Sequence, residues 1–510
     1  MTLRGLYLAF SEGLDPKANA RMLALFRRLL HSPPAGVTDL VPGYRNLYLE
    51  FDAERTSLGR LRGLVERALR GLPEGEEGRE VEVPVRYDGP DLVWVAERTG
   101  LSPQEVVRLH SEPLYRVFAT GFTPGFPFLG PLSERLRLPR RPTPRPQVPA
   151  HAVAIAGDQT GIYPLPSPGG WHLLGTALVQ MYNPHRPQPF YLQAGDRVRF
   201  VPAEGPTPPL PEPFELLPSE PRYPALRVLE PGLLDLVVDG GRRFGGHLGL
   251  AAGGALDARS ARVANALVGN PPHTPLLELT LKGPLLEALR PVVVAFAGYG
   301  MEPLLNGEPL AAGQSFALRR GDVLGFRSRP EGARGYLALA GGFESRRFWG
   351  SAGADVRGLI GRPLQAGDVL GVDHPRPVRP GRAWPMPRLV PAVVRLLPGP
   401  QFTPEALEAL CSGPYTLAAG DRMGLRLEGP WVPGGELTSE ATPLGAIQMT
   451  PQGQPIVLLN DRGRMGGYTK PAQVHPADLP RLAQLRPGEG LRFVWAGGTP
   501  LGYGGWEYPV

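Results

Sequence analysis

The sequence of 510 residues predicts a mainly β protein that begins with a small α+β unit. Glycine and proline are abundant, with 67 and 63 residues, and they separate many short apolar runs, as is typical of strands joined by tight turns. A Gly-Asp or Gly-Glu turn that enters a short alternating strand recurs at QAGDRVRF, RRGDVLGF, QAGDVLGV and RPGEGLRF. This internal repeat favours repeated barrel units, and the length favours three or four domains of about 150 residues each.

Residues 1–80 are expected to form an α+β domain. Residues 3–10 have the pattern of a strand, and residues 16–30 and 58–72 carry apolar side chains at helical spacing. Between these two helices, the segment TDLVPGYRNLYLEFD predicts two strands around a Pro-Gly turn. The order β-α-β-β-α fits a ferredoxin-like split βαβ module.

Residues 81–203 are expected to form a second domain, a closed barrel. Ser102 is a helix N-cap followed by Pro103, and short strands with Gly and Pro turns come after this helix. Residues 204–224 contain the run PTPPLPEPFELLPSEPRYP. So much proline cannot form a core or a helix, which predicts a semi-rigid linker.

The charged residues exclude some classes of partner. The net charge of +6 comes almost entirely from arginine, since the only lysines are Lys17, Lys282 and Lys470. The charges are scattered and form no dense basic block, so no nucleic-acid surface is predicted. No apolar run approaches the roughly 20 residues of a membrane span, and the N-terminus lacks a signal-peptide pattern. We therefore expect a cytoplasmic protein with no membrane partner.

Several catalytic motifs are missing from the sequence. There is no P-loop and no G-x-S-x-G elbow. None of the lysines stands in the Ser-Ser-Lys arrangement of amidase-signature enzymes, and there is no Met-Lys-Met biotin attachment site. The single cysteine, Cys411, and nine dispersed histidines predict no metal site. Any chemistry is therefore expected from polar groups on glycine-rich loops.

The segment from residue 116 to residue 175 is the richest in such loops. Its glycines and prolines predict a rigid pocket lined by Phe126, Tyr163 and Trp171, with Gln159 at the polar end; tight turns of a barrel are the alternative. His110 and Gln159 are candidate catalytic residues, although His110 also fits a helix C-cap. The candidate substrate-binding residues here are Phe122, Thr123, Gly125, Phe126, Thr160, Tyr163, Ser167, Trp171 and His172.

Arginines on glycine loops supply further candidates in the second half. Arg242 follows two glycines, Asp257 follows GGAL, and Arg464 lies in a G-R-M-G-G context; all three are candidate catalytic residues. Such arginines suit a bidentate grip on a carboxylate or phosphate, and an ion pair across a lobe interface is the alternative. The remaining candidate substrate-binding residues are Arg422, in the similar context D-R-M-G, Gln448, Asp461 and Tyr468.

Motifs in both halves resemble those of a known family. GFTPGFPFLG (121–130), AIAGDQTGIYP (154–164) and SPGGWHLLG (167–175) resemble the KipI family, or allophanate hydrolase subunit 1. VDGGRRFGGHLGL (238–250), GDRMGLRLEG (420–429) and residues 445–479 resemble the KipA family, or subunit 2. The resemblance implies two fused subunits with cyclophilin-like β-barrels, the second half forming lobes at 225–385 and 386–510. His151 and Thr176 depart from the family pattern, which usually has glycine and arginine there.

The resemblance also implies a function. These families include the B and C subunits of bacterial 5-oxoprolinase, so we expect a component of an ATP-dependent hydrolase that acts on the C–N bond of a small cyclic amide. ATP would be the co-substrate, with or without Mg, at an unknown site, and a LamB/YcsF-family protein would be the missing partner. The chain is not expected to be an amidase-signature allophanate hydrolase by itself, and homo-oligomerisation is left open.

Two other functions stay open at this point. One is a carboxyltransferase component that works with biotin on a partner protein, as in urea carboxylase, and the other is a Kip-type regulator that binds a histidine kinase. For the enzyme, the cleft is expected between the two halves, because binding sites often lie at domain interfaces. Residues 121–130 should then face Arg242, Asp257, or the loops that carry Arg422 and Arg464.

Overall fold

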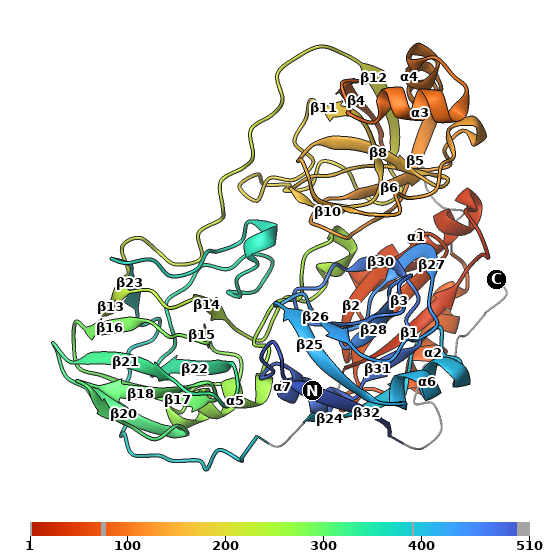
Figure 1. Cartoon of the computed structure of the whole chain (residues 1–510). Helices are drawn as coiled ribbons and strands as arrows, with labels where there is room; N and C mark the ends of the chain where they lie inside the picture. Colours follow the sequence, from red (N-terminus) through yellow and green to blue (C-terminus); the bar gives the residue numbers. More distant parts are fainter. Residues whose placement is uncertain (1–2, 73–77, 390–391, 497–510) are drawn as a thin grey trace.

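The computed structural model describes residues 3–72, 78–389 and 392–496 (Figure 1). These residues form four units, namely an N-terminal α+β unit, a first barrel, a lobe of two sheets and a second barrel. A barrel lies at the top of the view, a lobe of two sheets lies at the lower left, and a second barrel lies at the lower right beside the N-terminal unit. The fold is mainly β with an α+β start, which confirms the predicted class. Within the described residues, no helix is long and apolar enough to cross a membrane.

The N-terminal unit has the predicted order β-α-β-β-α. The apolar faces of its helices pack on a three-stranded antiparallel sheet in the order β1-β3-β2, and Asp15 caps the first helix by accepting from two backbone N–H groups. The sheet gains no strand from the segment that follows, because that strand enters the first barrel. The elements are β1 (Leu3–Ala9), α1 (Pro16–His31), β2 (Val37–Pro42), β3 (Asn46–Asp52) and α2 (Leu58–Leu69).

The first barrel is closed by seven strands in the order β11-β4-β12-β5-β6-β9-β8. Ser102 and Glu105 form a capping box at the start of α4. The barrel strands are β4 (Glu80–Arg86), β5 (Leu114–Thr120), β6 (Pro127–Gly130), β8 (Ala152–Ala156), β9 (Gln159–Ile162), β11 (His172–Ala177) and β12 (Arg197–Pro202). Outside it lie α3 (Leu92–Thr99), α4 (Pro103–Ser111), η1 (Glu134–Leu136) and a two-stranded antiparallel sheet of β7 (Arg145–Val148) and β10 (Ser167–Gly169).

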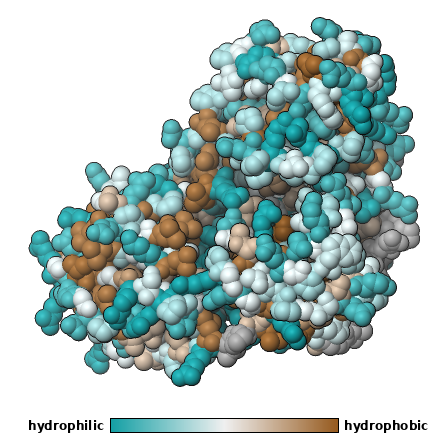
Figure 2. Space-filling view, in the orientation of Figure 1, coloured by the Kyte–Doolittle hydropathy of each residue, from teal (hydrophilic) through white to brown (hydrophobic). Residues whose placement is uncertain are grey.

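An extended segment, residues 203–223, leads from the first barrel to the lobe of two sheets, here called the middle lobe (Figure 1). Figure 2 shows apolar residues over this lobe and along the edge where it faces the first barrel. The predicted lobe 225–385 contains two open sheets rather than a closed barrel.

One sheet of the middle lobe has the order β19-β18-β21-β16-β13-β23 and the other has the order β14-β15-β22-β17-β20. Apolar side chains of both sheets share one core. The strands are β13 (Pro224–Glu230), β14 (Leu234–Val238), β15 (Leu276–Thr280), β16 (Leu285–Ala288), β17 (Val292–Gly298), β18 (Met301–Leu305), β19 (Glu308–Pro309), β20 (Gln314–Leu318), β21 (Val323–Ser328), β22 (Arg334–Leu339) and β23 (Val369–Gly371). The helices are η2 (Gly246–Leu248), α5 (Ala258–Leu267) and η3 (Val356–Gly358).

The second barrel repeats the topology of the first. Its strands close in the order β31-β24-β32-β25-β26-β29-β28, and in both barrels the first and last strands pair in parallel. The strands are β24 (Ala392–Pro398), β25 (Pro414–Gly420), β26 (Gly424–Glu428), β28 (Ala446–Met449), β29 (Pro455–Leu458), β31 (Ala472–Val474) and β32 (Gly490–Trp495). Around it lie α6 (Pro404–Cys411), η4 (Pro476–Asp478), α7 (Leu479–Leu482) and a two-stranded antiparallel sheet of β27 (Glu436–Ala441) and β30 (Met465–Tyr468).

The first and last units of the chain are in contact. The Tyr7 hydroxyl donates to the Ala441 carbonyl over 2.6 Å, and the Asn46 amide donates to Glu440 over 3.0 Å. In Figure 1 the N-terminal strands accordingly lie beside the strands of the second barrel. One buried apolar cluster joins the N-terminal unit, the first barrel and the two-stranded sheet of β27 and β30, so the two halves share a core.

Candidate functional site

The loop between β5 and β6, residues 121–126, is in close contact with the second half. A Cβ added to Gly121 would lie 2.2 Å from the Met465 side chain, and one added to Gly249 would lie 2.3 Å from the Thr123 carbonyl oxygen. Only glycine permits this approach. We call the place where loop 121–126, η2, β2 and residues 462–465 meet the junction.

The short helix η2 lies at the centre of the junction. The Gly125 N–H donates to the Leu248 carbonyl over 2.9 Å, and the Thr120 hydroxyl donates to the His247 carbonyl. On the other side, the Gly246 N–H donates to Asp39 over 3.3 Å. The middle lobe therefore inserts this segment between the first barrel and the N-terminal unit.

Arg464 reaches the junction from the second barrel. Its Nη2 donates to Asp39 Oδ2 over 2.5 Å, and the two side chains are 1% and 5% exposed. Burial outweighs the attraction of Arg464 and raises the pKa of Asp39 to about 6. The neighbouring Arg462 makes a similar buried pair with Glu50 over 3.4 Å. Two ion pairs therefore connect the halves.

Three polar side chains at the junction have groups with no hydrogen-bond partner among the residues that the structure describes. These groups are Thr123 Oγ1, His247 Nδ1, and the Nε and Nη1 of Arg464, and all are buried. Buried polar groups are normally satisfied, so such a gathering points to a bound ligand. Burial lowers the pKa of His247 to about 4, which leaves its imidazole neutral at pH 7.

The predicted aromatic residues lie together beside this junction. The Phe126 ring is 5.0 Å from that of Tyr163 and 5.7 Å from that of Trp171, centroid to centroid, and all three are buried. Phe122 packs edge-on against Phe126 at 5.6 Å. The rings fill much of the space between them and build one wall, and Gln159 lies buried at the start of β9. That these residues bind a ligand stays a prediction.

Other candidates of the first half serve the barrel. His110 lies inside it, with Nε2 2.8 Å from the Thr160 hydroxyl and Nδ1 2.8 Å from the Tyr87 hydroxyl, and burial lowers its pKa to about 3. This geometry offers no support for the catalytic role predicted for His110. His172 stacks on Trp94 outside the barrel. The Ser167 hydroxyl is buried in β10 without a partner among the described residues.

The two departures from the family pattern have different local settings. His151 has a φ of +65°, which is the left-handed conformation that favours glycine. This backbone conformation explains why the family pattern usually has glycine at this position. The Thr176 hydroxyl donates to Asp88 over 2.9 Å, on β11 at the barrel edge.

Arg422 and Asp257 belong to a different contact, between the middle lobe and the second barrel. Arg422 pairs with Asp461 over 2.7 Å and with the buried Glu278. Asp257 caps α5 and accepts from the Gln484 amide over 2.8 Å. The alternative interpretation of Arg422, an ion pair across a lobe interface, thus fits the geometry. Gln448 and Tyr468 lie apart from this pair, in β28 and β30.

Arg242 lies just before η2 but turns into the middle lobe. Its Nη2 donates to the Gly353 carbonyl, and its Nε and Nη1 are buried without a partner among the described residues. Residues 121–130 were expected to face Arg242, Asp257, or the loops of Arg422 and Arg464. In the structure, the Arg464 loop and the segment after Arg242 contact residues 121–126. The structure does not bring Arg422 or Asp257 there.

Several junction residues escaped the sequence analysis. Asp39 and Glu50 are charged residues in two short strands in which every residue is buried, and a buried charge needs a partner. Arg462 and His247 stand in the same glycine-rich stretches as predicted residues, but nothing in their spacing shows that they converge. No group of His, Cys, Asp and Glu that could hold a metal occurs in the described part of the chain.

The comparisons with known proteins match both halves. A family model described as carboxyltransferase domain, subdomain A and B, matches residues 248–495, and one described as carboxyltransferase domain, subdomain C and D, matches residues 1–192. The chain is 44% identical to the B subunit of 5-oxoprolinase from Escherichia coli O157:H7, over 36% of this chain and 84% of the relative. It is 33% identical to the C subunit of 5-oxoprolinase from Escherichia coli K12, over 53% and 90%.

Solved structures agree with this. The crystal structure of TTHA0988 is 62% identical, covers 96% of this chain and 100% of its own, and has a TM-score of 0.93. The Kluyveromyces lactis urea carboxylase is 29% identical over 55% of this chain and 28% of its own length, with a TM-score of 0.51.

Proposed function

The chain belongs to the carboxyltransferase-domain family as a fused KipI–KipA protein, and from this premise we propose that it provides the B and C components of an ATP-dependent 5-oxoprolinase. The enzyme would open the lactam of a small cyclic amide that carries a carboxylate. A LamB/YcsF-family protein would be the third component. Each half matches one of two separate relatives over most of its length, which supports the fused assignment.

The observation that carries the proposal is the set of unpartnered groups at the junction. Arg464 keeps one nitrogen on Asp39 and leaves Nε and Nη1 free of partners among the described residues. These two nitrogens are planar N–H donors of one guanidinium, and each can donate to an oxygen of a carboxylate or phosphate. In this desolvated setting they would also stabilise the oxygen charge that develops when the lactam is activated.

The other two groups fit a cyclic amide. A neutral imidazole at His247 can accept a hydrogen bond from the lactam N–H or donate one to its oxygen, and the Thr123 hydroxyl can do either. Phe126 and its neighbours would cover the apolar face of the ring and exclude water. Each half contributes some of these groups, which explains why the function would need both.

The proposal is tested by 5-oxoproline-dependent ATP turnover with and without the LamB/YcsF partner. Arg464→Lys keeps a charge beside Asp39 but removes the planar donor pair, so turnover should fall at least ~100-fold. Arg462→Lys is the matched control, because the Nε and Nη1 of Arg462 already donate to the carbonyls of Thr442 and Leu459. Turnover that needs no partner, or equal loss in both variants, would refute the proposed site.

A second candidate is a biotin-dependent carboxyltransferase component. The likeness to urea carboxylase over 55% of this chain favours it. The biotin would have to come on a partner, since no attachment motif occurs in the sequence. Transfer of a carboxyl group from a biotinylated carrier to urea, in the absence of 5-oxoproline turnover, would select this candidate over the first.

A further inference from the structure

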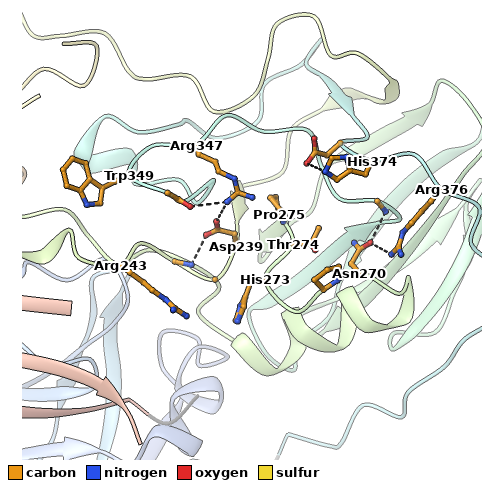
Figure 3. Close-up of a pocket in the computed structure, with 16 residues that line it drawn as sticks. Asp239, Arg243, Asn270, His273, Thr274, Pro275, Arg347, Trp349, His374 and Arg376 are labelled. Atoms are coloured by element: carbon orange, nitrogen blue, oxygen red, sulfur yellow. Dashed lines mark hydrogen bonds and ion pairs between the residues drawn. The ribbon is translucent and has the colours of Figure 1, made fainter. Parts of the chain in front are cut away.

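The middle lobe has a large pocket away from the junction's unpartnered groups. Its volume is about 740 Å³, within the range of small-ligand sites. It is formed by the loops that carry residues 239–243, 270–275, 347–350 and 373–376 (Figure 3). None of the candidates from the sequence lines it.

The pocket carries an excess of positive charge. Arg243 is exposed and has no hydrogen-bond or ion-pair partner among the described residues. Arg376 donates to the Val268 carbonyl and to Asn270 Oδ1 over 3.1 and 2.9 Å, and neither group is charged. Within the part of the chain that the structure describes, both guanidinium charges therefore lack a counterion, which favours an anionic ligand.

The two carboxylates that line the pocket do not cancel this excess. Asp239 accepts from Ser351 over 2.6 Å and from the Ala352 N–H over 2.8 Å, and its distance to Arg347 is 3.7 Å. Asp373 is held by Arg222, which lies outside the pocket, over 3.3 Å. Arg347 is the counterion of Asp239 and donates to the Gly350 carbonyl over 3.2 Å, and its exposed guanidinium is a third donor group that lines the pocket.

An exposed indole closes one end of the pocket. Trp349 is 40% exposed, and its Nε1 donates to the Phe244 carbonyl over 3.0 Å, which fixes the ring. Its φ of +51° is unusual for a side chain of this size, and such strain is common at binding sites. Figure 3 shows Trp349 and Arg376 at opposite ends, with Arg347 between them.

We propose that this pocket binds a nucleoside polyphosphate, with the base against Trp349 and the phosphates among Arg243, Arg347 and Arg376. A flat aromatic base suits a fixed indole, and phosphates suit arginines such as Arg243 and Arg376, which pair with no carboxylate among the described residues. This inference deepens the proposed ATP-dependent function and rests on it for the choice of nucleotide.

The pocket is physically connected to the junction. Asp239, Gly240, Gly241 and Arg243 line it, and the same segment continues into η2. A Cβ added to Gly245 would lie 3.4 Å from Trp349 Cδ1, and the Phe244 N–H donates to the Thr38 carbonyl over 3.2 Å. A bound nucleotide would therefore touch the segment that η2 extends between the two halves.

Equilibrium binding to the full chain, without 5-oxoproline or any partner, tests the site. We expect ATP to bind by calorimetry, and to bind at least ~10-fold more tightly than AMP or inorganic tripolyphosphate. Arg243→Gln should weaken ATP binding ~10-fold, and so should Arg376→Gln. Arg320→Gln, at an exposed arginine of the same lobe outside the pocket, is the matched control and should change nothing.

Three outcomes would overturn the inference. One is no ATP binding in the millimolar range, and another is ATP affinity unchanged in Arg243→Gln and Arg376→Gln. The third is tripolyphosphate binding as tightly as ATP, which would show that the pocket does not recognise the nucleoside. Trp349→Leu checks the base separately, since it should weaken ATP binding and leave tripolyphosphate unaffected. Because no turnover is measured, failure of the proposed hydrolase reaction would leave these readouts intact.

Discussion

Replacing Arg464 with alanine should destabilise the protein strongly at pH 8 and only slightly at pH 5. The variant leaves Asp39 buried, at 5% exposure, without its cation. Breaking a buried pair by removing one partner costs about 3–5 kcal/mol, because the remaining charge stays uncompensated. That is the loss expected at pH 8.

The pKa of Asp39 sets the difference between the two conditions. Its folded-state pKa of about 6 lies above the ordinary 3.8, so the folded chain holds this proton to higher pH than the unfolded chain. Asp39 therefore opposes folding increasingly as the pH rises from about 4 to about 6. At pH 5 the carboxyl is largely neutral already, so the variant should lose only about 1 kcal/mol, the contribution of one hydrogen bond.

Urea denaturation of the full chain, followed by tryptophan fluorescence at both pH values, measures this. Arg227→Ala is the control, because Arg227 pairs with Glu287 on the surface and is 49% exposed; its loss should stay below about 1 kcal/mol. Equal destabilisation of Arg464→Ala at pH 5 and pH 8 would refute the reasoning.

Three further predictions concern single sites and the isolated chain. Asp235→Asn should raise the free energy of unfolding by about 2 kcal/mol at pH 8, because burial raises the pKa of Asp235 to about 7. This gain should shrink towards pH 4, where the carboxyl is already neutral. A lower urea midpoint for the variant than for the unchanged protein at pH 8 would contradict this. Trp171→Ala should lower the free energy of unfolding by about 3–5 kcal/mol. In a double-mutant cycle with Arg464→Ala, the coupling energy measured in ligand binding should exceed about 0.5 kcal/mol. Strict additivity of the two substitutions would indicate two independent sites. The purified chain alone should hydrolyse neither allophanate nor ATP in ammonia and phosphate-release assays, and robust turnover would reveal a nucleophile that the sequence analysis missed.

Much of the barrel architecture could be predicted, because turn chemistry and strand periodicity are local. The recurring Gly-Asp or Gly-Glu turn enters β12 in the first barrel and the equivalent β32 in the second. Its other two copies, however, enter β21 and β23, which belong to the open sheets of the middle lobe. The motif therefore marks a way of entering a strand, and whether the sheet then closes depends on pairing between distant strands.

In the candidate site too, local features could be predicted from the sequence and contacts between distant segments could not. Arg422 and Arg464 have nearly the same local context, yet Arg422 meets Glu278 and Asp461 while Arg464 meets Asp39. Glu278 and Asp39 belong to other units of the chain, so the docking of whole units selects these two partners, whereas Asp461 lies in the same barrel as Arg422. The aromatic wall of Phe126 and Trp171 was predictable, since the glycines that allow close approach stand within the same segment.

The contact between the N-terminal unit and the second barrel bears on how such a protein arises. Its ion pairs and hydrogen bonds join residues of the KipI-like half to residues of the KipA-like half and involve nothing in residues 203–223. Two separately translated halves with these surfaces would recognise each other without a tether. Joining their genes would then add equal dosage and a higher local concentration, and a later gene split would be tolerated for the same reason.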